Sequence, residues 1–240
     1  MDYLELMKQN KPYASCDLDM PNEYQITSKK LCFEYNHTAP DETEKRREIL
    51  SKLFGTSDDN AIIEPSFRCD YGFNIHLHGF AFINYNCVFL DTSPIHIGKN
   101  VFIAPGVCLS CAGHAILPEQ RAEAIGTSAP IISEGDVWIG AHTTIIGGVT
   151  IGKGSVIGAG SVVLEEVPPN STVVGVPGRV VKRDNVLLPQ ETLDQCHLPD
   201  PVNEDIAILQ KENAELVNRV LDLERQLKEI EKETAKLSVK

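Results

Sequence analysis

Branched aliphatic residues recur at every sixth position through the middle of the chain. The clearest run extends from residue 139 to residue 163, and each aliphatic is followed four positions later by a small or β-branched residue. The same period appears between residues 97 and 109 and, more loosely, between 77 and 89. The aliphatic and aromatic positions are Ile139, Ile145, Ile151, Ile157 and Val163, then Ile97, Ile103 and Leu109, and finally Leu77, Ile83 and Phe89.

A period of six fits neither regular element by itself. An amphipathic α-helix repeats its apolar face every 3.6 residues, and a half-buried strand does so every two. A coil of short strands that turns at each sixth residue satisfies the pattern, with the aliphatic side chains inside the coil. The pattern therefore predicts a parallel β-helix over residues 61–182, in preference to an ordinary β-sandwich.

The period is interrupted after Leu109. A β-helix can release a loop only at a corner, so residues 110–132 are predicted to leave the coil as a loop with His114 at its root. Cys108 and Cys111 have C-x-x-C spacing but lie in register with the repeat, and no second C-x-x-C pair accompanies them. They are interpreted as small buried residues that fill the coil, rather than as a redox or zinc pair.

The two ends of the chain follow other patterns. Residues 1–60 lack the period and include TAPDETEKRREILSKLFG, which has an early proline, acids near its start and Gly55 at its end; these are helix signals. We expect a small helical cap there, with an apolar face formed by Ile49, Leu50, Leu53 and Phe54.

From residue 206, apolar positions alternate by three and four. This spacing predicts a coiled-coil helix over residues 204–240, joined to the body by a linker at 183–203. Asn213 at an a position favours two strands. A single amphipathic helix docked on the body is the alternative.

Composition restricts the partners. The formal net charge of −12 argues against a nucleic-acid or anionic-membrane surface, because both require basic patches. No apolar run approaches about 18 residues, and the N-terminus does not resemble a secretory signal. Seven cysteines spread along the chain suit reduced thiols. We expect a cytoplasmic protein that binds neither nucleic acid nor membrane.

Several stretches together resemble the maltose and galactoside O-acetyltransferases, which are hexapeptide-repeat acyltransferases that use acetyl-CoA. They are the I-G-x-x-x-x repeats, FEYNHTAPDETEKRREIL, RCDYGFNIHLH and VVGVPGRVV, and the resemblance covers residues 10–183. It implies a left-handed sense for the coil and a homotrimer whose active sites lie between two coils. The expected fold is mainly β: a left-handed parallel β-helix with a helical N-terminal cap and a C-terminal coiled-coil helix.

The family carries its catalytic histidine where this chain has His114, in SCAGH. A sugar hydroxyl is a poor nucleophile until its proton is removed, and an imidazole titrates near working pH. The resemblance implies that His114 is the general base for direct attack of the acceptor on the thioester, without an acyl-enzyme. The alternative is a loop histidine bonded to backbone.

The resemblance also assigns the binding residues. It places acceptor-binding groups at Asp70, Asn84, Asp91 and Asp17. For the three carboxylates, the alternative is a turn-forming aspartate. Glu165 departs from the lysine of galactoside-type members, so that contact to CoA is expected to be lost or moved. The pantetheine slot is matched by Ala141, Gly158, Ala159 and Gly160, and the phosphate-binding cations by Arg179, Lys182 and Arg183.

No metal is expected, because His76 and His78 have no accompanying cysteine or carboxylate. A second resemblance, of SVVLEEVPPNSTVVGVPGRVVKRDN, is to the serine O-acetyltransferases. The acceptor half lacks their DIHP…DHGTG type of stretch, so a sugar-type hydroxyl is favoured and serine is the alternative acceptor. An alternative function of another class is a non-catalytic trimeric scaffold that displays coiled coils. For an enzyme or a scaffold alike, the C-terminal coiled coil would allow a higher assembly.

Overall fold

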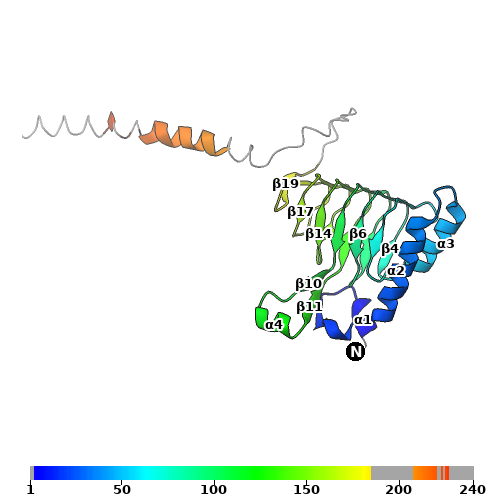
Figure 1. Ribbon diagram of the computed structural model, residues 1–240. Coiled ribbons are helices and arrows are strands. Elements are labelled where there is room, and N and C mark those ends of the chain that lie inside the picture. Colours follow the sequence, from blue (N-terminus) through cyan, green and yellow to red (C-terminus); the bar gives the residue numbers. More distant parts are fainter. Residues whose placement is uncertain (1–2, 185–207, 221–222, 224, 227–240) are drawn as a thin grey trace, which may run out of the picture. The chain divides into compact units, whose positions relative to one another are not determined.

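The computed structural model describes residues 3–184, 208–220, 223 and 225–226 (Figure 1). The chain divides into two compact units, Met1–Leu198 and Pro199–Lys240. Each unit is described by itself.

The first unit is built around a parallel β-helix of three sheets, and the chain visits the sheets in turn. The first sheet holds β4 (Ile75–Leu77), β7 (Ile95–Ile97), β12 (Ile131–Ser133) and β15 (Thr150–Ile151). The second holds β2 (Ile62–Ile63), β5 (Ala81–Ile83), β8 (Val101–Ile103), β13 (Trp138–Ile139), β16 (Val156–Ile157) and β18 (Thr172–Val174), with β19 (Arg179–Lys182) antiparallel at its edge. The third holds β3 (Arg68–Cys69), β6 (Val88–Leu90), β9 (Cys108–Ser110), β14 (Thr144–Ile146) and β17 (Val162–Val163).

Two corners of this coil matter for the site. The slot corner leads from the second sheet to the third and includes residues 84–87, 104–107, 140–143 and 158–161. The loop corner leads from the third sheet to the first and includes residues 70–74, 91–94 and 111–130. Backbone hydrogen bonds stack successive turns at each corner, as from Gly140 N to Ile157 O (2.8 Å) and from Cys111 N to Leu90 O (3.0 Å).

The six-residue period is confirmed as the inner surface of the coil. All the aliphatic and aromatic positions of the period are buried. The residues four positions later are buried too, and their hydroxyl groups donate to nearby carbonyls: Thr143 Oγ1 to Gly140 O (2.7 Å) and Ser161 Oγ to Gly158 O (2.7 Å). Small hydroxyl residues therefore tolerate burial here because each finds a backbone acceptor.

The interpretation of the C-x-x-C pair needs one correction. Cys111 is buried as expected, but Cys108 is only half-buried. Successive side chains of a strand point to opposite faces, and Leu109 takes the inner position of β9. Cys108 therefore faces outward.

The helical cap is confirmed and is larger than the sequence indicated. It comprises α1 (Tyr3–Met7), β1 (Tyr13–Cys16), the short 3₁₀ helix at Asp17–Asp19, α2 (Asn22–His37) and α3 (Thr43–Leu53). The predicted face of α3 joins the same core as the first turns of the coil. The side-chain amide of Asn36 in α2 forms two hydrogen bonds with the backbone of Phe67. Its Nδ2 donates to the Phe67 carbonyl (2.8 Å), and its Oδ1 accepts from the Phe67 N–H (2.9 Å).

The predicted loop is an ordered arm that leaves the coil (Figure 1). It consists of β10 (Ala112–His114), α4 (Pro118–Ala122) and β11 (Ile125–Ser128). β11 lies between β10 and β1, and both pairings are antiparallel. The arm and the N-terminal cap thus form one small sheet, which the sequence did not predict.

In the second unit, residues 208–220 are helical and exposed. The predicted C-terminal helix is confirmed for these residues, and its pairing as a coiled coil stays a prediction. Most of the expected linker at 183–203 and the remaining predicted heptads lie outside the described residues. No helix in the described part of the chain has the length and apolarity needed to cross a membrane.

Three imidazoles stack on the outer face of the first sheet. His76 and His96 are in register on β4 and β7, with ring centroids 4.9 Å apart, and His78 lies 5.2 Å from His96. His96 Nε2 is 2.8 Å from Asn10 Oδ1. Burial and the neighbouring imidazoles lower the pKa of His96 to about 4, and burial followed by the charge of His78 lowers that of His76. Across the described ranges, no group of three His, Cys, Asp or Glu residues is arranged to hold a metal.

This stack predicts a loss of stability in acid. The folded pKa of His96 lies below its unfolded value of about 6.5, so the unfolded state binds more protons as the pH falls from about 6.5 towards 4. Partial exposure reduces the effect to about 1 kcal/mol, or about 2–4 °C in Tm. Melting curves of wild type and His96→Gln at neutral pH and in mild acid measure it. Equal acid-induced losses in the two proteins would contradict the prediction.

Candidate active site

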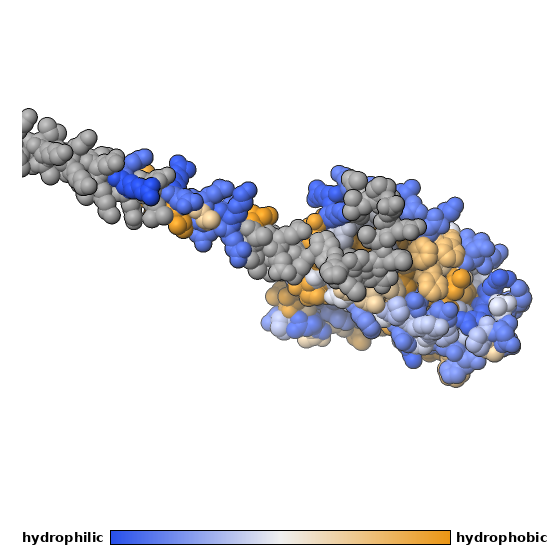
Figure 2. All heavy atoms as spheres, turned by 90° about the horizontal axis from the view of Figure 1, so that it is seen from above, coloured by the Kyte–Doolittle hydropathy of each residue, from blue (hydrophilic) through white to orange (hydrophobic). Residues whose placement is uncertain are grey.

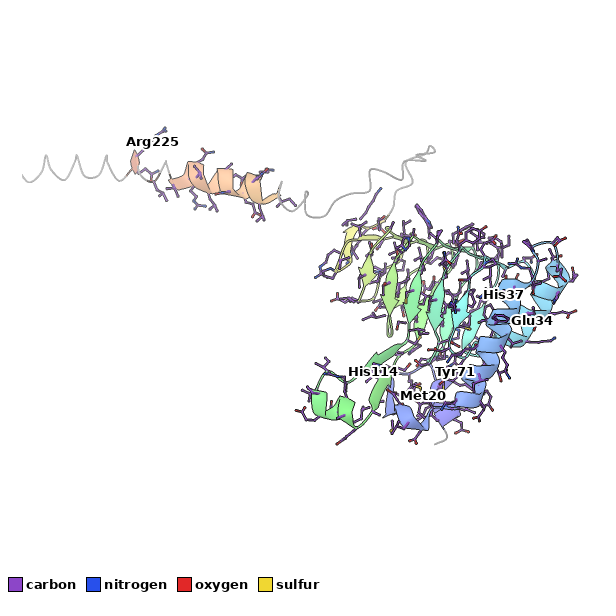
Figure 3. All side chains as sticks on the ribbon, viewed as in Figure 1. Met20, Glu34, His37, Tyr71, His114 and Arg225 are labelled. Carbon is purple, nitrogen blue, oxygen red and sulfur yellow. The ribbon has the colours of Figure 1, made fainter. Side chains whose placement is uncertain are left out.

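His114 is paired with an aspartate from the other end of the sequence. It lies at the end of β10, and its Nδ1 is 3.1 Å from Asp17 Oδ2. The His114 side chain is 70% exposed and that of Asp17 is 22% exposed. Figure 3 shows His114 on the arm, in the region of Met20, which lines the same small cavity. The imidazole is therefore held at one nitrogen while the ring stays open to solvent.

Local backbone pairing brings Asp17 to this position. β1 ends at Cys16, which is in register with Ile125 of β11, and His114 is in register with Gly126 on the other side of the same strand. The Asp17 N–H donates to the carbonyl of Ala124 at 2.7 Å. Asp17 was expected to contact the acceptor. Its contact in the structure is with the histidine.

Gly126 is required by this geometry. A Cβ atom at this position would overlap the Asp17 carboxylate, meeting Oδ1, Cγ and Oδ2. The absence of a side chain on the central strand therefore lets the carboxylate cross over β11 and reach the imidazole. Gly126 was not identified from the sequence, because its role depends on a pairing between segments about a hundred residues apart.

Hydroxyl groups hold the base of the arm against the coil. Tyr13 OH donates to Thr92 O at 2.7 Å, and Ser128 Oγ donates to Ser93 Oγ at 2.8 Å. Thr92 Oγ1 and Ser128 Oγ are 2.7 Å apart. These contacts tie β1 and β11 to the loop corner. These contacts had no sequence signal beyond the polar run DTS.

The cavity beside the pair is small within one chain. It has a volume of about 20 Å³ and is lined by His114, Asp17, Tyr13 and Thr92 among others. A cavity of this size has room for about one water molecule. A sugar-sized molecule therefore does not fit in this cavity, whereas the exposed side of the imidazole is open to solvent.

Asp91 lies at the loop corner with a fully buried carboxylate. Its Oδ1 accepts from the N–H groups of Asp70 (3.0 Å) and Tyr71 (2.8 Å), while Oδ2 accepts from that of Asn74 (3.3 Å). Burial raises its pKa to about 7. The expected contact of Asp91 with the acceptor stays a prediction, and in this chain its carboxylate is occupied by backbone N–H groups. It fixes the turn that carries Asp70.

Asp70 lines a groove of about 630 Å³ between α2 and the outer faces of β3 and β6. Its side chain is half-buried, and burial raises the pKa of its carboxyl group, opposed by the charge of Lys29. Asp70 and His114 stand at the same corner of the coil, two turns apart, with the turn at residues 91–94 between them. Asp70 therefore keeps the access that an acceptor-binding role requires.

The remaining expected binding residues lie at the slot corner or close to it. Asn84 directly follows β5, and its Oδ1 accepts from Tyr85 N at 2.8 Å. Ala141 and the stretch Gly158, Ala159 and Gly160 stack at this corner, where Gly160 N donates to Ala141 O at 2.8 Å. Arg179, Lys182 and Arg183 are exposed on and just after β19. The structure thus separates two groups: His114, Asp17 and Asp70 at one corner, and Asn84 with the slot residues at another.

The slot corner is open to solvent at Ala159 and Gly160. Gly160 has φ +71, and no heavy atom lies within 4 Å of the position that a Cβ would take. Ala159 is exposed beside it. The three exposed cations suit phosphate oxygens. Glu165 is exposed at the start of the segment after β17, at the loop corner, where it offers no phosphate contact.

A three-sided coil of six-residue repeats, with a histidine on an arm at one corner, defines a hexapeptide-repeat transferase. The family model for the maltose acetyltransferase hexapeptide capping motif matches residues 7–58, and that for the bacterial transferase hexapeptide (six repeats) matches residues 134–165. The galactoside O-acetyltransferase of Escherichia coli K12 is 40% identical over 77% of this chain and 91% of the relative. The chain belongs to the maltose and galactoside O-acetyltransferase family.

Solved structures agree with this assignment. A maltose O-acetyltransferase from Clostridium difficile 630 aligns with a TM-score of 0.70 and 41% identity, over 76% of this chain and 97% of that one. A hexapeptide-repeat acetyltransferase from Vibrio cholerae, in complex with acetyl-CoA, aligns with a TM-score of 0.70 and 33% identity, over 76% and 98%.

Proposed function

We propose that this protein transfers an acetyl group from acetyl-CoA to a hydroxyl of a sugar or a related small molecule, with His114 as general base. The observation that carries the proposal is the contact of His114 Nδ1 with the Asp17 carboxylate, on an otherwise exposed ring. A base needs one nitrogen held and the other free to meet the acceptor.

In the proposed mechanism each partner has its own role. Asp17 accepts from the protonated Nδ1, which leaves Nε2 unprotonated and oriented outward. Nε2 takes the hydroxyl proton as the acceptor oxygen attacks. Asp17 stabilises the imidazolium that forms, and His114 then gives the proton to the departing thiolate. Bound acetyl-CoA supplies an activated thioester carbonyl.

We also infer a homotrimer in which neighbouring copies complete each site. His114 and Asp70 stand at the loop corner, whereas the expected CoA slot stands at the slot corner, so one coil presents the two halves in different places. The second sheet carries an outward ladder of Ile62, Phe82, Phe102, Trp138 and Val156 in register.

Three members of that ladder are large exposed hydrophobic residues, and Figure 2 shows apolar residues reaching the surface of the coil. An apolar surface of this kind marks an interaction site. A coiled coil of C-terminal tails would then link copies within or between trimers. The described cysteines are free thiols, which supports the expected cytoplasmic setting.

Thiol release from acetyl-CoA with a panel of acceptors tests the proposed reaction. The panel holds a galactoside, maltose, an amino sugar and L-serine, with a no-acceptor control. We expect release with a sugar hydroxyl and none with L-serine. Turnover of serine alone would favour the alternative acceptor, and no turnover with any acceptor would favour the scaffold reading.

The Asp17 contact predicts a defined loss in two variants. Gly126→Ala pushes the carboxylate away from His114, and Asp17→Asn removes its charge in place. Each is expected to lower kcat by about 10–100-fold with little change in the KM for acetyl-CoA, because the imidazole loses its orienting partner. Steady-state kinetics measure both, and Gly135→Ala is the matched control. If Gly126→Ala kept full turnover, the positioning role of Asp17 would be refuted.

A further inference from the structure

Two thiols meet at the junction between the cap and the coil. Cys32 of α2 and Cys69 of β3 are 37 residues apart in sequence, and their Sγ atoms are 3.6 Å apart. Both are 6% exposed and belong to the core that joins the cap to the first turn. Figure 1 shows α2 alongside this end of the coil. The acetyl-transfer chemistry uses neither thiol.

The surroundings of the two sulfur atoms differ. A hydrogen bond from the Cys69 thiol lowers the pKa of Cys32, whereas the pKa of Cys69 is raised well above its usual value by this same bond and by burial. Ser28 Oγ lies 3.3 Å from Cys69 Sγ and can hold it in place. Thiolates rather than thiols are nucleophiles. Cys32 is therefore the attacking sulfur, and Cys69 is the resolving one.

The pair can be reached from solvent. Cys32 and Cys69 both line the groove of about 630 Å³ that also contains Asp70. Lys29 and Arg68 stand in the same groove and bring positive charge to it, whereas the charge of the buried Asp91 raises the pKa of both cysteines. A small oxidant can therefore enter this groove and reach the two thiols, whereas another protein is too large to do so.

We propose that Cys32 and Cys69 are an oxidisable pair, and that hydrogen peroxide converts them into a disulfide that links the cap covalently to the coil. The Cys32 thiolate attacks one peroxide oxygen, forming an S–O bond as the O–O bond breaks, and the leaving hydroxide takes a proton to become water. Cys69 then loses its proton and attacks the sulfenic sulfur. The S–S bond forms, the S–O bond breaks, and a second water leaves. The two thiols lose two electrons and two protons, and one peroxide becomes two waters.

The bond would act beside the candidate acceptor residue. Cys69 directly precedes Asp70 in sequence, and Asp70 N is held by the buried Asp91. Drawing the sulfur atoms from 3.6 Å to the roughly 2.05 Å of a disulfide pulls α2 towards β3 at the groove. Because the bond also closes a loop in the unfolded chain, it stabilises the folded state.

Peptide mapping of the wild-type protein tests the proposal directly. Native protein is treated with about one equivalent of hydrogen peroxide, denatured, alkylated and digested without reductant. We expect a cross-linked Cys32–Cys69 peptide that is two hydrogens lighter than its reduced parts, and a rise in Tm of about 5 °C. Dithiothreitol reverses both effects. Cys108→Ser, which removes a more exposed thiol, keeps the cross-link, and Cys32→Ser abolishes the rise in Tm.

Two results would overturn the proposal, and neither depends on acetyl transfer. One is oxidation confined to Cys16 and Cys108, with Cys32 and Cys69 both alkylated after denaturation. The other is a Cys32–Cys69 cross-link that forms only when peroxide is added to the unfolded chain. Mapping the wild-type protein makes the test independent of whether the serine variants fold.

Discussion

Replacing His114 with alanine is expected to reduce kcat for acetyl transfer by about 100-fold or more. The side chain is 70% exposed and its Nδ1 contacts Asp17, so its removal leaves the core and the coil unchanged. The loss should fall on kcat rather than on the KM for acetyl-CoA, because the expected slot lies at another corner. Thiol release under saturating donor measures it.

The control for this variant is another exposed histidine. His78 is exposed directly after β4 and is not part of the arm, so His78→Ala should retain wild-type turnover. Equal Tm values for wild type and His114→Ala exclude misfolding. Near-full turnover by His114→Ala, with its fold intact, would remove the general-base assignment and leave the loop histidine as a structural residue.

Two inactive variants should restore each other when they are assembled together. His114→Ala damages the loop corner, and Ala159→Glu places a carboxylate at the exposed slot corner. In a mixed trimer, some interfaces join an intact loop corner from one copy to an intact slot corner from the next. Random assembly of equal amounts gives about a quarter of the sites in working form. Activity of the co-refolded mixture is therefore expected at about a quarter of wild type.

The outcome distinguishes a shared site from a site within one chain. If both halves of the site came from the same copy, the mixture would be as inactive as its parents. A mixture of His114→Ala with His114→Asn serves as the control, because both copies are damaged on the same half and no interface can be complete. The masses of the parent assemblies, measured separately, establish the number of copies.

The coil was predictable because its signal is local and repeated. Each turn places an aliphatic residue in the same buried environment. Equivalent positions in successive turns, such as Ile145 and Ile157, therefore carry the same kind of side chain, and their spacing reveals the coil. The interruption at His114 was visible for the same reason. A broken period locates a corner without knowledge of what the arm contacts.

The missed elements lack such signals. α2 buries Ser28, Cys32 and Tyr35, which have helical i, i+4, i+7 spacing but are not the aliphatic residues by which an apolar face is recognised. β1 pairs with β11 across more than a hundred residues, and no local pattern specifies that partner. Asp17 was found through a family match alone, and Gly126 was not found, because the contact between them exists only after this pairing.

The pairing of β1 with β11 has a consequence for synthesis on the ribosome. Residues 13–16 emerge early, but their strand partner at residues 125–128 is translated more than a hundred residues later. Until then β1 is an open edge that other nascent chains can join. Asp17 is therefore translated before His114, but it can reach the imidazole only after β11 has been made. A chain truncated before residue 125 would contain both Asp17 and His114 and still lack the strand that brings them together.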